Sequence, residues 1–162
     1  MKTKETPESI QLDDRRSLIM SEIMTPDTAN FQGNVHGGYL LMLLDRVAYA
    51  CASRFSGNFI VTLSVDQVIF KEPIHVGELV FIQASVNYVG HTSLEVGMRV
   101  IAENLYTHER RHTNTSYFTM VAVDEKGKPT KLPPLTIETD VQKRRFEAAL
   151  KRRDIRLQQK QK

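Results

Sequence analysis

One carboxylate stands inside the most apolar segment of the sequence. Asp45 lies in the run 37–55, whose apolar residues would surround most of the circumference of a helix. Moving a carboxylate into such surroundings is costly unless it is paired or hydrogen-bonded. Acidic side chains in apolar sites are candidates for a general base or a nucleophile. The alternative without a catalytic role, that Asp45 faces solvent or pairs with a basic residue, stays open when this residue is considered by itself.

The residues just before this run could bind a polarised carbonyl group. Gly37 and Gly38 open the predicted helix, where free backbone N–H groups can stabilise an anion and form an oxyanion hole. Asn30 could orient a water molecule or the carbonyl, although an Asx turn is the commoner role of an asparagine in such a loop. Ordinary capping and close packing also explain many glycine pairs, so neither feature decides the chemistry.

The spacing of these residues predicts a site shared between chains. Gly37 and Asp45 are separated by roughly 12 Å along a helix axis, at 1.5 Å per residue. A reacting carbonyl must lie about 3 Å from its donors, with the attacking group nearby. One helix can hardly supply both ends to one atom. Two antiparallel copies side by side could do so, provided that both residues serve one reaction.

The flanking segments must position this helix, and most of them have the period of strands. We expect strands over 17–24, 61–70, 77–88, 94–100 and 113–123, with a pattern break at 110–112, a turn-rich loop over 25–35, a turn at 125–128 and a C-terminal helix over 138–159. This order predicts an α+β fold with an antiparallel meander. One curved sheet covers only part of an apolar helix, so we expect a second chain to cover the rest.

Composition narrows the class of protein. The chain has 162 residues, of which 41% are hydrophobic and 25% charged, which suits one globular domain. The lone cysteine, Cys51, excludes an internal disulfide and is expected in the core. Residues 1–16 are polar, without the apolar stretch of a secretory signal, and no apolar run approaches the roughly 18–20 residues of a membrane span. We therefore expect a soluble cytoplasmic protein.

The positive charge is concentrated at the C-terminus. Residues 143–162 carry a net charge of +7, so the other 142 residues carry −4 although the whole chain has +3. Nucleic-acid binding would depend on this tail alone and is not expected. We expect Arg144, Arg145, Arg152 and Arg153 to form a solvated face. The expected divisions are a lead-in at 1–16, one domain at 17–135 and a basic helix or tail at 136–162.

Together, the motifs resemble those of hotdog-fold acyl-CoA thioesterases, in particular brain-type cytosolic acyl-CoA hydrolases and their single-domain bacterial relatives. The central motif is Asn30-x-x-Gly33-x-x-x-Gly37-Gly38, followed by Leu43-Leu44-Asp45. Further similar motifs are Val61-Thr62-Leu63-Ser64-Val65-Asp66, Phe70-Lys71-Glu72-Pro73, Val76-Gly77-Glu78, Gly90-His91-Thr92-Ser93 and Phe118-Thr119-Met120-Val121-Ala122. The resemblance covers about residues 17–135.

The resemblance implies a long central helix wrapped by a curved antiparallel sheet, in a dimer whose two sheets join. Three such dimers often form a hexamer. It implies hydrolysis of a fatty acyl-CoA to free acid and CoA, without a metal or redox cofactor. By position, Asn30 and Asp45 are the catalytic pair, contributed by different subunits, with amides near Gly37 and Gly38 polarising the carbonyl. Asn34 is a second candidate that the motif does not demand.

The substrate should be bound by groups that match its phosphates and its acyl chain. Thr92 and Ser93 are expected along the CoA path from their position in the family. Lys71 and Arg99 are candidates for the phosphates because they are basic, although water-facing strand residues explain them equally well. The acyl chain is expected to lie along apolar residues such as Val65.

Two rival functions remain. A hotdog hydratase or dehydratase commonly uses a histidine with a carboxylate, and His36 lies close to the helix start. A non-catalytic acyl-CoA sensor would keep the groove but lose the catalytic acid, which Asp45 argues against. A metal site at His108-x-x-x-His112 is not expected, because that spacing falls in a charged break between strands. No serine has the context of a hydrolase nucleophile.

Overall fold

The computed structural model of the chain describes residues 14–66 and 68–159, so most of the expected lead-in at 1–16 lies outside the described residues. The elements are β1 (Ser17–Ile23), the short 3-10 helix η1 (Pro26–Thr28), α1 (Gly37–Ser56), β2 (Phe59–Val65), β3 (Leu79–Val89), β4 (Ser93–Glu103), β5 (Arg110–Val123) and α2 (Asp140–Gln159). The expected α+β fold with one long central helix is confirmed.

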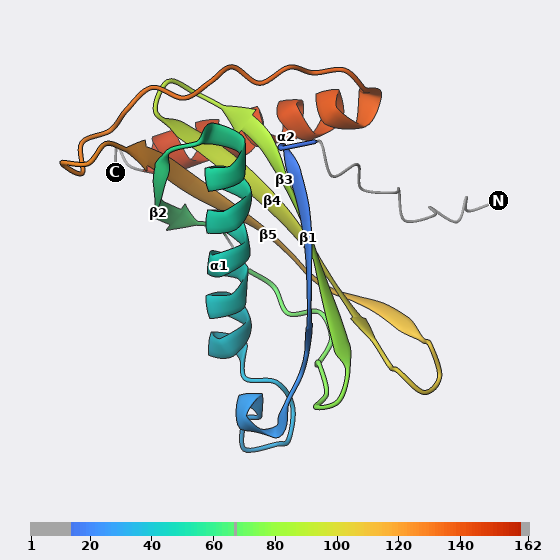
Figure 1. Cartoon of the computed structure of the whole chain (residues 1–162). Coiled ribbons are helices and arrows are strands. Elements are labelled where there is room, and N and C mark those ends of the chain that lie inside the picture. The colour runs from blue at the N-terminus through green and yellow to red at the C-terminus, as the bar shows by residue number, and fades with distance from the viewer. Residues whose placement is uncertain (1–13, 67, 160–162) are drawn as a thin grey trace.

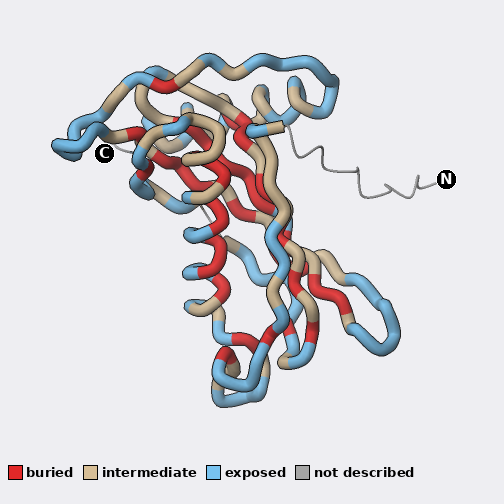
Figure 2. Tube along the Cα trace, viewed as in Figure 1, coloured by how far each residue is buried: buried red, intermediate tan, exposed pale blue. Residues whose placement is uncertain are grey.

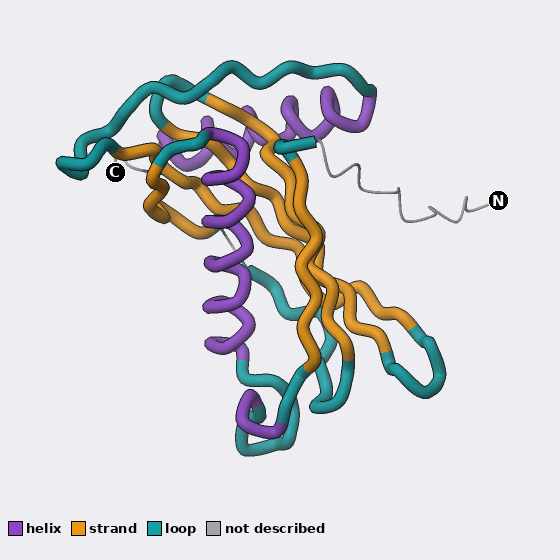
Figure 3. The backbone as a smooth tube through the Cα atoms, in the orientation of Figure 1, coloured by secondary structure: helices purple, strands orange, loops and turns teal. Residues whose placement is uncertain are grey.

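The five strands form one antiparallel sheet in the order β1-β3-β4-β5-β2. Strands β3, β4 and β5 are consecutive in the chain and form the meander that the alternating pattern predicts. The sheet curves around α1, which lies across one of its faces (Figure 1). The loops gather at the ends of the strands, and the β4–β5 hairpin projects beyond the rest of the sheet (Figure 3). Strand β2 is left as an edge of the sheet.

Helix α1 begins and ends where its sequence allows. The His36 side chain caps the first turn, and Gly57 ends the helix with a φ of 69°, a left-handed conformation that favours glycine. Its buried side packs against the sheet through Leu44, Val47 and Cys51, which have no exposed surface. Burial raises the pKa of the Cys51 thiol to about 12, so this cysteine behaves as a core residue, as expected.

The opposite side of α1 is open, so the sheet of one chain covers only half of the helix, as expected (Figure 2). Leu41, Met42 and Tyr49 are large apolar side chains on this open side, and Met42 is 42% exposed. Along the neighbouring edge strand β2, Phe59 is 64% and Leu63 is 54% exposed. Val61 and Val65 of the same strand are also exposed, so α1 and β2 both present large apolar side chains to solvent in one chain.

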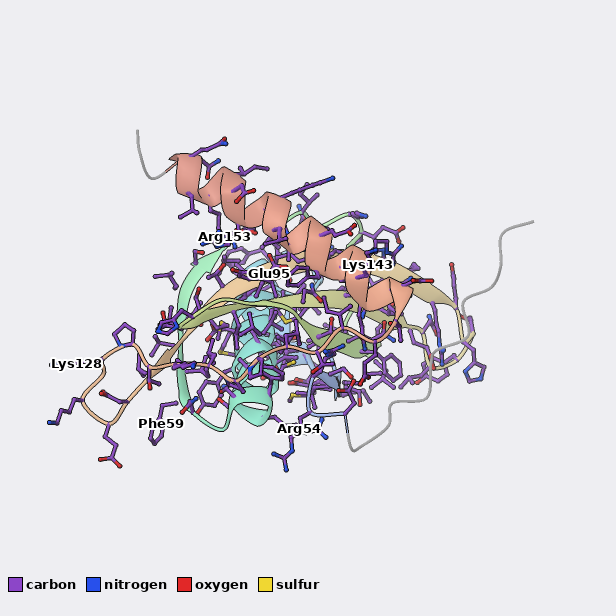
Figure 4. The ribbon with its side chains drawn as sticks, turned by 90° about the horizontal axis from the view of Figure 1, so that it is seen from above. Arg54, Phe59, Glu95, Lys128, Lys143 and Arg153 are labelled. Carbon is purple, nitrogen blue, oxygen red and sulfur yellow. The ribbon has the colours of Figure 1, made fainter. Side chains whose placement is uncertain are left out.

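The other face of the sheet is covered by α2. Seen from above, α2 lies on the side of the sheet opposite to α1 (Figure 4). Ala149 of α2 is fully buried, and the ring of Phe146 on α2 lies 5.6 Å from the ring of Tyr88 on β3, measured between centroids. The C-terminal segment therefore packs against the same sheet as α1.

A charged pair fastens α2 to the sheet. Glu95 on β4 is only 1% exposed, and Arg152 donates to its two carboxylate oxygens at 2.7 and 3.0 Å. The same guanidinium lies 3.5 Å from the centroid of the Tyr117 ring. The prediction of a solvated face is thus wrong for Arg152, because this arginine lies on the inward side of α2 and neutralises a buried carboxylate. Arg156 donates to Asp66, just after β2, at 2.7 Å.

Two strand boundaries differ from the sequence-based expectation. Strand β2 ends at Val65 and does not continue to Phe70, because the chain bulges between Thr62 and Ser64 and then leaves the sheet edge. Strand β5 begins at Arg110, so the expected break at 110–112 is wrong. Charged side chains are tolerated there because Arg110 pairs with Glu103 directly across the β4–β5 ladder. Neither helix of the described residues offers the long apolar stretch that a bilayer crossing requires.

Candidate active site

Asp45 lies on the open side of α1, and its partner is a threonine of the edge strand. The Thr62 hydroxyl donates to Asp45 Oδ1 at 2.6 Å. Both residues are exposed in one chain, so the expectation of a carboxylate enclosed in apolar surroundings is not met within a single subunit. The helix is apolar around Asp45, but the sheet covers only its far side. Thr62 thus fixes one of the two carboxylate oxygens of Asp45.

The first turn of α1 offers backbone donors, one of which is engaged by the helix cap. The first intrahelical bond runs from the Leu40 N–H to the His36 carbonyl, so the amides of Gly37, Gly38 and Tyr39 precede it. The Gly38 N–H donates to His36 Nδ1 at 3.0 Å. The Gly38 N–H is thus engaged by the cap in this structure, and its role as an oxyanion donor stays a prediction, as does that of the Gly37 amide; the Tyr39 amide is a further candidate. With its Nδ1 accepting, His36 serves as a helix cap, which weakens the hydratase alternative.

Asn30 holds the loop that leads into α1. Its Oδ1 accepts from the backbone N–H groups of Gln32 at 2.8 Å and Asn34 at 3.2 Å, which is the Asx turn considered above. Gly33 completes the turn with a φ of 79°. The Asx turn occupies only the carbonyl oxygen of the side chain. The Nδ2 group of Asn30 is a donor, so the residue can hold the loop and also donate to a water molecule or carbonyl.

Asn34, the second candidate of the loop, has a structural contact. Its Oδ1 lies 2.9 Å from His75 Nδ1, and the two residues form an isolated β-bridge. The Val35 N–H also donates to the Ile74 carbonyl at 2.8 Å. These contacts tie the loop before α1 to the segment between β2 and β3.

The five predicted substrate-binding residues fall into separate groups. Lys71 and Arg99 both lower the pKa of His112, after the larger effect of its burial, so the three residues share one basic region on β4, β5 and the loop after β2. Thr92 and Ser93 lie at the opposite end of β4, where the Thr92 carbonyl accepts from Ala122. Val65 ends the open edge strand.

Comparison with known proteins gives the family. The Thioesterase superfamily matches residues 32–107. The chain is 53% identical over 148 residues to Protein VdlD of Helicobacter pylori, covering 91% of this chain and 84% of that one. It superposes on the crystal structure of an apo-hexameric acyl-CoA thioesterase with a TM-score of 0.86 and 36% identity, covering 90% of this chain and 93% of that one. The chain belongs to the hotdog-fold acyl-CoA thioesterases.

A second solved member of the acyl-CoA thioesterases carries ligands. The acyl-CoA hydrolase of Staphylococcus aureus, in complex with butyryl coenzyme A, coenzyme A and coenzyme A disulfide, has a TM-score of 0.80 and 30% identity, with 90% of this chain and 91% of that chain covered. The hotdog fold that the motifs imply is thereby confirmed.

Sequence reasoning missed one residue of the site. Thr62 belongs to a motif that supported the resemblance, but it was not assigned a role. The sequence feature that could have indicated a role for Thr62 is a hydroxyl residue between two apolar neighbours, Val61 and Leu63, in the strand that follows the Asp45 helix. That signal is weak, because threonine is common in strands. Only the packing of β2 beside α1 reveals the contact with Asp45.

Proposed function

We propose that this protein hydrolyses fatty acyl-CoA to free fatty acid and CoA at a site built from two copies of the chain. Membership of the acyl-CoA thioesterases shows the reaction class. One observation supports the proposal that the site is shared between two chains. Asp45, held by Thr62, lies on an open apolar side of α1, two helical turns from the Gly37 amide of its own chain. A second copy can bring its own helix start to that carboxylate.

The proposed chemistry begins with the thioester carbonyl. The Gly37 N–H and the Asn30 Nδ2 group of one subunit donate to the carbonyl oxygen or hold the attacking water. Asp45 of the other subunit takes a proton from this water, whose oxygen then bonds to the carbonyl carbon. Collapse of the tetrahedral intermediate breaks the C–S bond and releases the CoA thiolate, which takes up the proton held by Asp45. The mechanism needs no metal and no redox cofactor.

Direct attack by Asp45, forming an anhydride, is the alternative for the same residue. The two routes differ in the origin of the oxygen in the first molecule of product. In a single turnover in ¹⁸O-labelled water, general-base catalysis places the label in the fatty acid. Nucleophilic attack followed by hydrolysis at the aspartyl carbonyl leaves the first product unlabelled.

The second copy has a defined place to bind. Strand β2 is an edge with unpaired backbone groups and exposed apolar side chains, which proteins normally cover. Antiparallel pairing of two β2 strands would join the sheets and bury the open side of both α1 helices. We propose this dimer as the basic unit and three such dimers as the assembly, which agrees with the hexameric state of a solved relative. Relatives named as cytosolic acyl coenzyme A thioester hydrolases support a cytoplasmic location.

Substituted forms of the S. aureus relative support the assignment of residues. An asparagine, an aspartate and a threonine of that protein were each replaced by alanine, and they follow one another with the same spacing as Asn30, Asp45 and Thr62. The relative's complex with butyryl coenzyme A likewise supports an acyl-CoA substrate.

The decisive experiment mixes two inactive variants. Asp45→Ala and Asn30→Ala are each expected to abolish release of free thiol from acyl-CoA. After subunit exchange, each mixed dimer has one site with both residues intact, so an equal mixture should recover about a quarter of the wild-type activity. A site within one chain would recover none. If Asp45→Ala releases thiol at the same rate as wild type, this carboxylate has no role in the mechanism.

The rival functions are tested with the same protein. A hydratase would consume the absorbance of an enoyl-CoA without releasing thiol. A sensor would bind acyl-CoA without turnover. Thiol release by wild type at a rate that depends on Asp45 excludes both.

A further inference from the structure

The loop between β2 and β3 places an aromatic ring over the start of α1. The Phe70 atoms Cε2 and Cζ lie 3.5 Å from the position that a Cβ on Gly37 would occupy. The Phe70 residue is nevertheless 47% exposed, so part of its surface is available to a bound molecule. Phe70 therefore borders the Gly37 amide, which is the donor proposed for the thioester carbonyl.

The backbone of Phe70 is held on both sides. The Ile69 carbonyl accepts from Asn114 Nδ2 at 3.0 Å, and the Lys71 N–H donates to the Thr113 carbonyl at 3.0 Å. Asn114 and Thr113 are both buried in β5. Hydrogen bonds to the residues before and after Phe70 leave its backbone little freedom. The ring is therefore carried by a backbone anchored to β5, unlike a side chain on a free loop.

Arg111 fastens the next part of the same loop. Its guanidinium donates to the Pro73 carbonyl at 2.9 Å, to Glu72 at 3.3 Å and to Glu78. Glu78 is 5% exposed, and its other carboxylate oxygen accepts from the His75 N–H at 2.8 Å. A planar guanidinium can satisfy acceptors in several directions at once, which a lysine ammonium on a flexible stem does less well.

We propose that Phe70 is the residue that selects against branching next to the thioester carbonyl, and that Arg111 is the positioning residue that holds it there. This inference rests on the proposed function, since it places the carbonyl at the Gly37 amide of the same chain. A ring beside that amide meets the first carbons of the acyl chain and leaves the distant ones untouched. Phe70 therefore excludes a methyl group on the carbon next to the carbonyl, whereas chain length is decided elsewhere.

The test compares butyryl-CoA with isobutyryl-CoA, which differ in branching at that carbon. The measured quantity is the ratio of kcat/KM for the straight and the branched substrate, from thiol release. Excluding one methyl group is worth about tenfold or more, so wild type should prefer butyryl-CoA by at least that factor. Phe70→Ala should bring the ratio close to one, and Phe70→Leu should give an intermediate ratio while keeping an apolar side chain in place.

Arg111 is tested through its effect on Phe70. Arg111→Met should lower the ratio in the wild-type background and leave it unchanged in the Phe70→Ala background, because the arginine acts through the ring. Arg111→Lys should restore part of the ratio. Arg110→Met is the matched control. Arg110 is its neighbour in β5, but it pairs with Glu103 and lies 5.7 Å from the Phe81 ring centroid, so the ratio should stay at the wild-type value.

The outcomes separate this inference from the proposed function. Absence of thiol release by wild type with both substrates and with long-chain acyl-CoA would overturn the proposed function itself. Hydrolysis by wild type with no preference, or with a preference unchanged in Phe70→Ala and Phe70→Leu, would overturn the role of Phe70 alone. Equal effects of Arg111→Met in both backgrounds would reduce Arg111 to a structural residue.

Discussion

Replacing Thr62 by valine removes the hydroxyl that orients Asp45 and changes little else. The threonine Oγ1 donates to Asp45 Oδ1 at 2.6 Å, and both side chains are exposed in one chain. Valine has nearly the same shape and suits an edge strand, so the fold of β2 should be retained. The substitution therefore isolates one hydrogen bond to a carboxylate.

The expected magnitude follows from that bond. A hydrogen bond to a charged group is worth about 1.5–3 kcal/mol. If it acts in the transition state, its loss lowers kcat/KM by about one to two orders of magnitude, since about 1.4 kcal/mol corresponds to a factor of ten. The loss should fall mainly on kcat, because an unoriented Asp45 affects the chemical step and leaves substrate binding largely intact.

The assay is thiol release from a short-chain acyl-CoA over a range of substrate concentrations. Thr62→Ser keeps the hydroxyl and is the control, which should retain most of the activity. Thermal unfolding of both variants should shift little, since a substitution at an exposed site typically changes stability by about 0.5 kcal/mol or less. Wild-type kcat in Thr62→Val, or an equal loss in both variants, would show that the hydroxyl does not prepare Asp45 for catalysis.

Three further predictions concern the rest of the molecule. Arg152→Met leaves the buried Glu95 carboxylate without its main partner and should cost about 3–5 kcal/mol in urea unfolding, whereas adding Glu95→Gln should recover much of the loss. The pKa of His112, measured by NMR titration, should lie below its ordinary value because of burial and nearby positive charge, and Lys71→Gln should raise it part of the way back. Cys51 should resist alkylation in the native protein at neutral pH and react on unfolding, because burial raises its pKa to about 12.

The local parts of the site were predictable because neighbouring residues carry them. The helix over 37–55 follows from a run of apolar residues after two glycines, and the structure extends it by one residue to Ser56. Once that segment is helical, the distance along the axis between Gly37 and Asp45 follows from the rise per residue. The alternation of apolar and polar residues likewise predicted most strands, because side chains of a strand point to opposite faces in turn.

Contacts between distant segments escaped prediction. Arg152 and Glu95 are 57 residues apart, and each alone resembles an ordinary surface charge. The capping of Gly38 by His36 is local, but it depends on a side-chain rotamer that residue types do not specify. The placement of the Phe70 ring against Gly37 also depends on how the loop after β2 is anchored to β5.

By itself, the sequence determined the long helix, the antiparallel strands and the resemblance that leads to thioester hydrolysis, because periodicity and motif spacing are properties of neighbouring residues. Tertiary structure alone decided that Thr62 touches Asp45, that one side of α1 stays open and that an arginine of α2 pairs with a buried glutamate of the sheet. These facts depend on which strand ends as the sheet edge and how each helix is rotated on the sheet. Both are determined by how the whole chain packs.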